Sequence, residues 1–92
     1  MGRFLGVSKR KKQEVVIKII NEWDPIGLLA MGAGEDRYRL EIDKIVDALD
    51  QVHSVDELAS YIKHYMDASF STDFPSITCL QVAVLIWEEI KD

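Results

Sequence analysis

The side chains best able to do chemistry gather in one stretch of the first half of the chain. They are two aromatics, a proline and three carboxylates: Trp23, Asp24, Pro25, Glu35, Asp36 and Tyr38. On a loop held by a rigid scaffold, such a set would form a surface that recognises a protein partner. Each acid also has a structural explanation, because Asp24 can cap a helix and Glu35 and Asp36 suit the start of one. Whether Trp23 points into the core or toward solvent separates these two interpretations, and the sequence leaves both open.

The same carboxylates, joined by Glu41 and Asp43, are numerous enough to suggest a metal site or an acid–base pair. Their spacing matches no calcium loop or zinc-binding helix, and glycosidase-type chemistry needs two carboxylates at a set separation in a cleft. His53 and His64 lie further apart than the i, i+4 spacing of common histidine ligand pairs. We therefore predict no catalytic, cofactor-binding or metal-binding residue and no cofactor, and we expect the chain not to be an enzyme.

Cys79 is the one cysteine of the chain, so an intramolecular disulfide is excluded. At the start of a helix it could be a reactive thiol, because helix N-termini lower the pKa of a thiol. Buried cysteines more often behave as small apolar core residues. The first residues lack the pattern of a secretory signal, and with a lone cysteine this favours a cytoplasmic location.

Charge is distributed unevenly along the sequence. Residues 1–12 hold five basic and no acidic side chains, including the cluster Lys9 to Lys12, whereas residues 13–92 hold sixteen acidic and six basic ones. An acidic body repels phosphate, so we expect no nucleic acid as partner. The basic cluster reads as a solvated helix start, although a contact with acidic lipid, with nucleic acid, with a neighbouring acidic body or with the chain's own body stays open.

Apolar residues recur at helical spacing in four segments, over about residues 9–22, 36–52, 54–70 and 76–91. Ser54 and Glu57 form a capping box at the start of the third segment, and Asp24 and Pro25 predict a short helical turn over residues 25–29. In the second segment we expect Glu41 to lie on the outward face, beside an apolar stripe that starts at Tyr38.

The fourth segment is apolar on nearly every side, which predicts a buried helix lying centrally against the other three. The expected fold is therefore an all-α, compact four-helix bundle-like domain with a long first connection that contains the Trp-Asp-Pro sequence. We expect one domain over residues 1–92, with residues 1–8 as a flexible lead-in. No apolar run is long enough to span a bilayer.

Four short sequences carry a family resemblance. They are Trp-Asp-Pro-Ile at 23–26, Gly-Glu-Asp-Arg-Tyr at 34–38 with Glu41 and Ile42 after it, Ser-Val-Asp-Glu-Leu-Ala at 54–59, and Ile-Trp-Glu at 86–88. Over about residues 13–91 the chain resembles the YugE-type family of small bacterial helical proteins of unknown function. It departs from that pattern at Arg37, where an acid commonly precedes the tyrosine. The resemblance implies an all-helical fold and no particular activity.

The Trp-Asp-Pro element is also similar to one in some small bacterial immunity-like proteins, which bind and neutralise a partner toxin. We therefore expect a small cytoplasmic, non-enzymatic protein-interaction module that uses the stretch from Trp23 to Tyr38. One alternative is a small-molecule or metal-responsive module that uses Asp24, Glu35, Asp36 and Tyr38. Another is a structural homo-oligomer that buries part of the apolar surface of the fourth helix.

Overall fold

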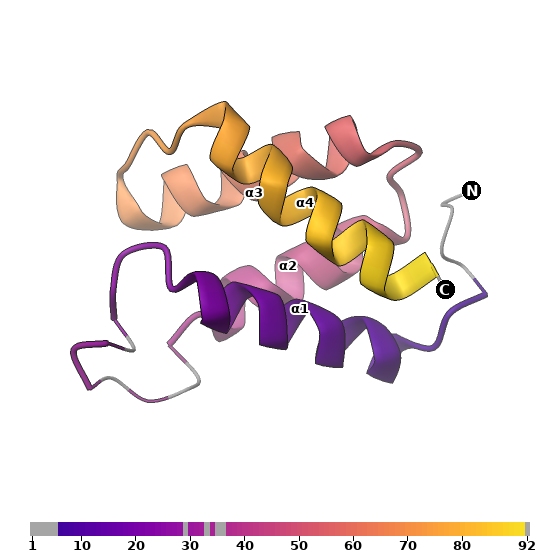
Figure 1. The fold of residues 1–92 in the computed structure, drawn as a ribbon, viewed down its shortest axis with the longest axis horizontal. Helices are drawn as coiled ribbons and strands as arrows, with labels where there is room; N and C mark the ends of the chain where they lie inside the picture. Colours follow the sequence, from indigo (N-terminus) through magenta and orange to yellow (C-terminus); the bar gives the residue numbers. More distant parts are fainter. Residues whose placement is uncertain (1–5, 29, 33, 35–36, 92) are drawn as a thin grey trace.

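The computed structural model describes residues 6–28, 30–32, 34 and 37–91. These residues form four helices: α1 (Lys9–Trp23), α2 (Arg39–Leu49), α3 (Val55–Phe70) and α4 (Ser76–Lys91) (Figure 1). Within these ranges there is no strand, which confirms the all-α prediction. None of the described helices is long and apolar enough to cross a membrane.

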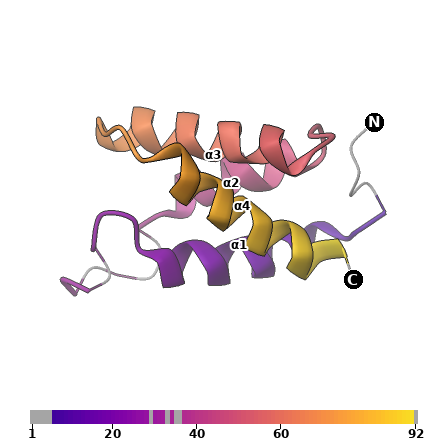
Figure 2. The ribbon, with the colours of Figure 1, turned by 45° about the horizontal axis from the view of Figure 1, so that its top comes forward.

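The helices follow one another in a ring, so that α1 packs on α2, α2 on α3, α3 on α4, and α4 back on α1. The fourth helix starts beside α3 and descends toward α1 along its length (Figures 1 and 2). The backbones of α4 and α2 do not approach each other closely. The prediction of a central α4 is therefore wrong, because each helix of a four-membered ring keeps one face toward solvent.

The outer face of α4 shows the consequence of this position. Ile77, Val84 and Leu85 are exposed to 62%, 41% and 56%, although all three are large aliphatic side chains. They lie at i, i+7 and i+8, which places them on one stripe of the helix. The inner face of the same helix is fully buried at Ala83, Ile86 and Ile90. Helix α4 therefore carries apolar residues both on its buried face and on its exposed face.

The predicted apolar stripes of the other helices form the core. Its largest fully buried side chains are Tyr38, Ile20, Ile42, Ile45, Leu49, Leu58, Ile62, Met66, Ile86, Ile90, Val16 and Val52. One expectation for the second helix is wrong, since Glu41 is only 6% exposed. It lies in the first turn of α2, where the positive end of the helix dipole favours a carboxylate.

The helix ends follow from local side-chain chemistry. The Ser8 hydroxyl accepts from the Lys11 amide at 3.1 Å, and the Ser54 hydroxyl accepts from the Glu57 amide at 3.2 Å. The Glu57 carboxylate reaches back to the amide of His53, one residue before the cap. The capping box is therefore confirmed, with its return bond displaced by one residue. The second helix is shorter than the predicted 36–52 and begins at Arg39.

Candidate functional site

Asp24 closes α1 and begins the long first connection. Its backbone adopts the left-handed conformation, with φ 47° and ψ 63°, and its amide donates to the carbonyl of Ile20. Aspartate is among the few residues that tolerate this conformation. One carboxylate oxygen, Oδ1, accepts a 2.6 Å hydrogen bond from the Tyr38 hydroxyl, and the other, Oδ2, accepts from the Ala30 amide at 3.0 Å.

Tyr38 lies at the other end of the connection and is fully buried. Its hydroxyl oxygen accepts from the amides of Ile26 and Leu28, each at 3.4 Å, while the edge of its ring packs on Phe70 at 5.8 Å between centroids. Burial, followed by the bond to Asp24, raises the pKa of the Tyr38 hydroxyl. The hydroxyl therefore stays protonated and holds the connection against the core.

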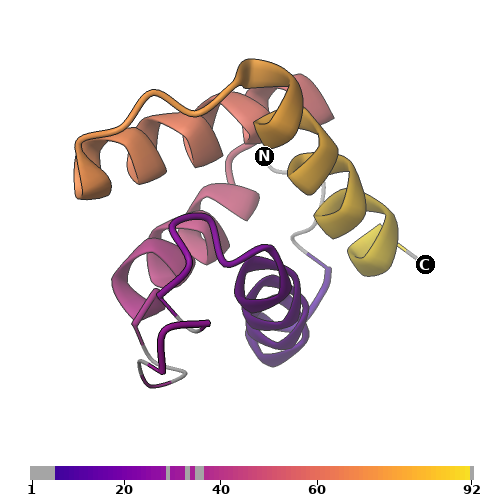
Figure 3. The ribbon, with the colours of Figure 1, turned by 60° about the vertical axis from the view of Figure 1, so that its left-hand side comes forward.

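These contacts correct the predicted role of Asp24. It does not cap a helical turn, because residues 25–28 are not helical and its carboxylate accepts from Tyr38 and Ala30 instead, whereas residue 29 lies outside the described residues. The amide of Gly27 donates to the Asp24 carbonyl at 2.9 Å in a turn. Gly27 has φ +73°, which suits glycine. Seen from the end of α1, the chain after Trp23 crosses toward α2 (Figure 3). Pro25 is half-buried in this turn.

The predicted recognition stretch is thus only partly assembled as expected. Asp24 and Tyr38 do meet, but they bond to each other and to the backbone of the connection. Glu35 and Asp36 lie outside the described residues. Among the described residues, no group of three or more His, Cys, Asp or Glu side chains is placed to hold a metal ion.

Trp23 belongs to both the core and the surface, since its side chain is half-buried. The ring packs on Phe74, with 5.5 Å between centroids and planes tilted by 59°. Its other side borders a groove between α1 and α4, which we call the α1–α4 groove. The groove has a volume of about 280 Å³ and is lined by Ile19, Glu22, Trp23, Thr78, Gln81, Val82 and Leu85.

The α1–α4 groove has an apolar floor and an open rim. Ile19 and Val82 form the buried floor, whereas Leu85, Glu22 and Gln81 are exposed. At one end the two helices converge (Figures 1 and 2), and an ion pair of 3.4 Å between Lys18 and Glu89 joins them there. Trp23 stands toward the end where the helices separate. The groove is therefore a wedge that opens beside an aromatic ring.

Sequence reasoning identified Trp23 and the apolar surface of the fourth helix separately, but not that the two border one groove. A helix that is apolar on every side leaves one apolar side open in a ring of four helices, but its spacing alone predicts a buried central helix. Leu85 and its neighbours on the outer stripe became candidates only once the ring arrangement was known.

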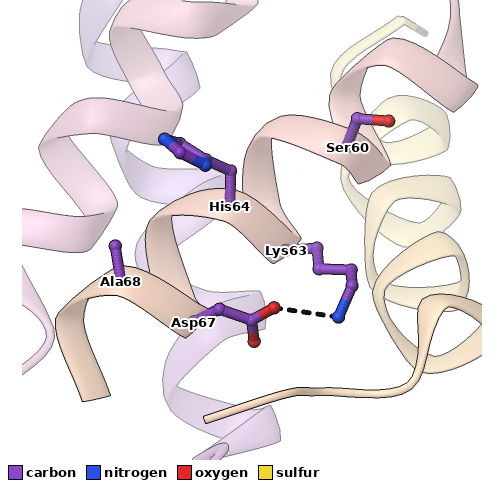
Figure 4. A pocket seen from close by; sticks show the side chains of 5 residues that line it. All are labelled: Ser60, Lys63, His64, Asp67 and Ala68. Atoms are coloured by element: carbon purple, nitrogen blue, oxygen red, sulfur yellow. Dashed lines mark hydrogen bonds and ion pairs between the residues drawn. The ribbon is translucent and has the colours of Figure 1, made fainter. Parts of the chain in front are cut away.

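A second hollow lies on the outer face of α3 and is lined by Ser60, Lys63, His64, Asp67 and Ala68, with a volume of about 530 Å³ (Figure 4). All its lining residues belong to one helix, so it is a wide, shallow surface. Figure 4 shows the His64 ring pointing away from Lys63. In this hollow His64 is therefore not paired with Lys63.

Lys63 in that hollow already has three acceptors. Its ammonium lies 2.8 Å from Asp67, 2.7 Å from Asp73 and 2.6 Å from the Phe74 carbonyl. The bonds to Asp67 and Asp73 raise the pKa of the Lys63 amine, and the bond from Lys63 together with the Phe74 amide lowers the pKa of Asp67. This cluster ties the α3–α4 connection to α3, which is a structural role.

Two more predicted candidates belong to the interior. Cys79 is 1% exposed, and burial raises the pKa of its thiol, so it is a core residue and not an activated nucleophile. Lys12 departs from the expected solvated helix start, since it is 4% exposed and its ammonium pairs with Asp50. Lys9 and Arg10 of the same cluster are exposed. The cluster therefore contacts the acidic body through Lys12.

Comparisons with known proteins agree with the family resemblance. The model of the domain of unknown function DUF1871 matches residues 15–92. The chain is 34% identical to the uncharacterised protein YugE of Bacillus subtilis (strain 168) over 68 residues, which cover 74% of this chain and 73% of that protein. No solved structure matches the chain. The chain therefore belongs to the DUF1871 family of proteins, whose function is unknown.

Proposed function

We propose that this chain is a non-enzymatic protein-interaction module that binds a partner protein in the α1–α4 groove. The observation that carries the proposal is Trp23 at the mouth of the groove, partly buried against the core, with the 56%-exposed Leu85 on the opposite wall. Tryptophan is enriched among the residues that dominate binding energy at protein interfaces. An exposed aliphatic stripe rimmed by polar side chains is typical of such a docking surface.

The dimensions of the groove favour a protein segment over a small molecule. Its volume of about 280 Å³ lies just below the ~300–1,000 Å³ of pockets for drug-sized ligands. Its polar lining residues, Glu22, Thr78 and Gln81, stand among the apolar side chains without a buried cluster that could orient a small ligand. Two or three apolar side chains of a partner would fill such a space.

The polar groups of Asp24 and Tyr38 in the first connection are less available to bind a ligand than the sequence suggested. Both oxygens of the Asp24 carboxylate accept hydrogen bonds from the protein, and the Tyr38 hydroxyl is buried against that carboxylate. A ligand would have to displace these bonds, which also hold the connection together. A cytoplasmic location is part of the proposal and is supported by the single cysteine, since disulfide-stabilised secreted domains carry several.

The test compares the same substitution at two exposed leucines, one inside the α1–α4 groove and one outside it. Leu85→Glu puts a charge into the groove, and Leu40→Glu makes the same change on α2, where Leu40 is 71% exposed. Surface substitutions of this kind change stability by about 0.5 kcal/mol or less. Each variant and the wild type are used to capture proteins from the source organism, and captured proteins are then purified and titrated by calorimetry.

We expect a protein that binds wild type and Leu40→Glu with equal affinity and binds Leu85→Glu at least about tenfold more weakly, the usual effect of losing an interface anchor. Circular dichroism and urea denaturation establish that all three chains are equally folded. If every captured protein binds Leu85→Glu as tightly as wild type, the α1–α4 groove is not the docking surface.

A further inference from the structure

We infer that the partner segment is an amphipathic helix with lysine or arginine beside its apolar face. The inference rests on the proposed function and specifies its partner. It follows from the shape of the α1–α4 groove, from the charges around its mouth and from the backbone groups that the protein offers to a partner.

A helix suits the geometry of the groove. Within the described residues there is no strand, so no sheet edge is offered to an extended peptide. On α4 the lining residues Thr78, Val82 and Leu85 lie at i, i+4 and i+7, so the groove follows the helix for two turns, which is about 10 Å. The side chains of an amphipathic helix at i, i+3/i+4 and i+7 would match that length.

The charges around the mouth of the groove favour a basic segment. Glu22 lines the groove, is exposed and forms no ion pair with the described residues. Asp73, next to the Phe74 that supports Trp23, is 96% exposed in its side chain. The nearby cations are already paired, Lys18 with Glu89 and Lys63 with both Asp67 and Asp73. A cation on the partner would therefore meet the Glu22 carboxylate, whereas Lys18 and Lys63 already have acceptors among the described residues.

A second copy of the chain fits this surface less well. In a symmetric dimer the same patch faces itself, so the Glu22 side chains and the acidic bodies of both copies would approach each other. Like charges at an interface oppose association, whereas opposite charges speed encounter and select the partner. The rim therefore points to a partner of opposite charge.

The test uses synthetic peptides that lack tryptophan. The first is a 14-residue helix of leucine and lysine, with leucine at i, i+3/i+4 and i+7. The second keeps its leucines and replaces each lysine by glutamate, and the third keeps the lysines and replaces each leucine by glutamine. Binding to the full chain is measured by calorimetry, and the indole signal of Trp23 in ¹H–¹⁵N spectra shows where the peptide lies.

We expect only the Leu/Lys peptide to bind with one-to-one stoichiometry and to shift the Trp23 indole signal. Leu85→Glu should weaken this binding roughly tenfold or more, although it adds a negative charge. This separates the groove from general attraction to an acidic protein. Leu40→Glu, which adds the same charge elsewhere, should leave the affinity unchanged or slightly higher.

Charge reversal tests the basic character directly. Glu22→Lys should weaken the Leu/Lys peptide roughly three- to tenfold and strengthen the Leu/Glu peptide, because it changes the sign at the rim. Asp47→Lys makes the same charge change at an exposed position on α2 and should alter neither affinity by more than about twofold.

Several results would overturn the inference. Equal binding of the Leu/Lys and Lys/Gln peptides would show that the interaction is charge alone. Tight binding of the Leu/Glu peptide, lost with Leu85→Glu, would keep the docking surface and reject the basic partner. A wild-type dimer in light scattering that Leu85→Glu dissociates would identify a second copy as the occupant. Absence of binding by all three peptides would reject the inference, whereas the capture experiment tests the groove itself.

Discussion

The hydroxyl of Tyr38 donates a 2.6 Å hydrogen bond to the carboxylate of Asp24, and this bond joins the residue that ends α1 to the residue that precedes α2. The same hydroxyl accepts hydrogen bonds from two backbone amides of the connection, and the same carboxylate accepts one from a third amide. The long connection is therefore organised around one buried polar pair. This gives Asp24 and Tyr38 of the sequence a structural role.

Tyr38→Phe should destabilise the protein by about 1.5–3 kcal/mol, the usual effect of removing a hydrogen bond to a charged partner. The change deletes only the hydroxyl, so the ring contact with Phe70 remains. Urea denaturation followed by circular dichroism gives the free energy of unfolding. Tyr61→Phe is the control, because Tyr61 is half-buried and its hydroxyl forms no hydrogen bond with the described residues. Equal losses for both variants would contradict the assigned role of the Tyr38–Asp24 pair.

The ion pair between Lys12 and Asp50 predicts that removing only the Asp50 charge costs more stability than removing both charges. Asp50→Asn should cost about 2 kcal/mol of unfolding free energy, less than the ~3–5 kcal/mol of a fully buried pair, because Asp50 itself is half-exposed. The loss arises because the Lys12 ammonium, only 5% exposed, stays buried without its counter-charge.

Lys12→Met added to Asp50→Asn should restore most of that stability, since methionine buries no charge. The free energies of unfolding of the two single variants and the double variant form a thermodynamic cycle. Additive losses in the double variant would mean that the two side chains do not stabilise each other.

Asp67 should make part of the stability pH-dependent. Its pKa lies below the ordinary value of about 3.9, so its contribution is fully present above that pH and disappears as the pH falls through the folded-state pKa. Asp67→Asn should lower the free energy of unfolding at pH 7 and should reduce its further loss on acidification to about pH 2.

Denaturation of wild type and Asp67→Asn at both pH values measures this difference. Asp56→Asn is the control, because Asp56 is an exposed carboxylate on the same helix. If Asp67→Asn loses as much stability on acidification as wild type does, the contact of Asp67 with Lys63 and the Phe74 amide does not carry the pH dependence.

The Cys79 thiol should react only when the protein opens. A thiol reagent such as dithionitrobenzoate should label native Cys79 on the order of 100-fold or more slowly than the unfolded chain, because local or global opening must come first. Ile77→Cys combined with Cys79→Ala moves the thiol two residues along α4 to a position that is 62% exposed in the wild type. That variant should label rapidly, and equal rates would show that Cys79 is accessible.

The sequence alone was enough for most features that depend on neighbours within one or two helical turns, although Glu41 and the turn after Asp24 were exceptions. Four helices with their apolar stripes were predicted, and Ser54 was identified correctly as the cap of α3. Capping and amphipathic spacing involve residues three or four apart, so the chemistry is visible along the chain. The family and its all-helical fold were recognised for the same reason, from short local sequences.

Tertiary structure decided every feature that depends on which helices become neighbours. The sequence predicted where α1 ends, but only the structure shows that the Asp24 carboxylate accepts from Tyr38, fourteen residues away, and does not cap a following helical turn. The exposed face of α4 is likewise set by its packing beside α3 and α1 only, which no spacing of apolar residues reveals. Periodicity identifies which residues share a face, whereas burial of that face depends on packing between segments distant in sequence.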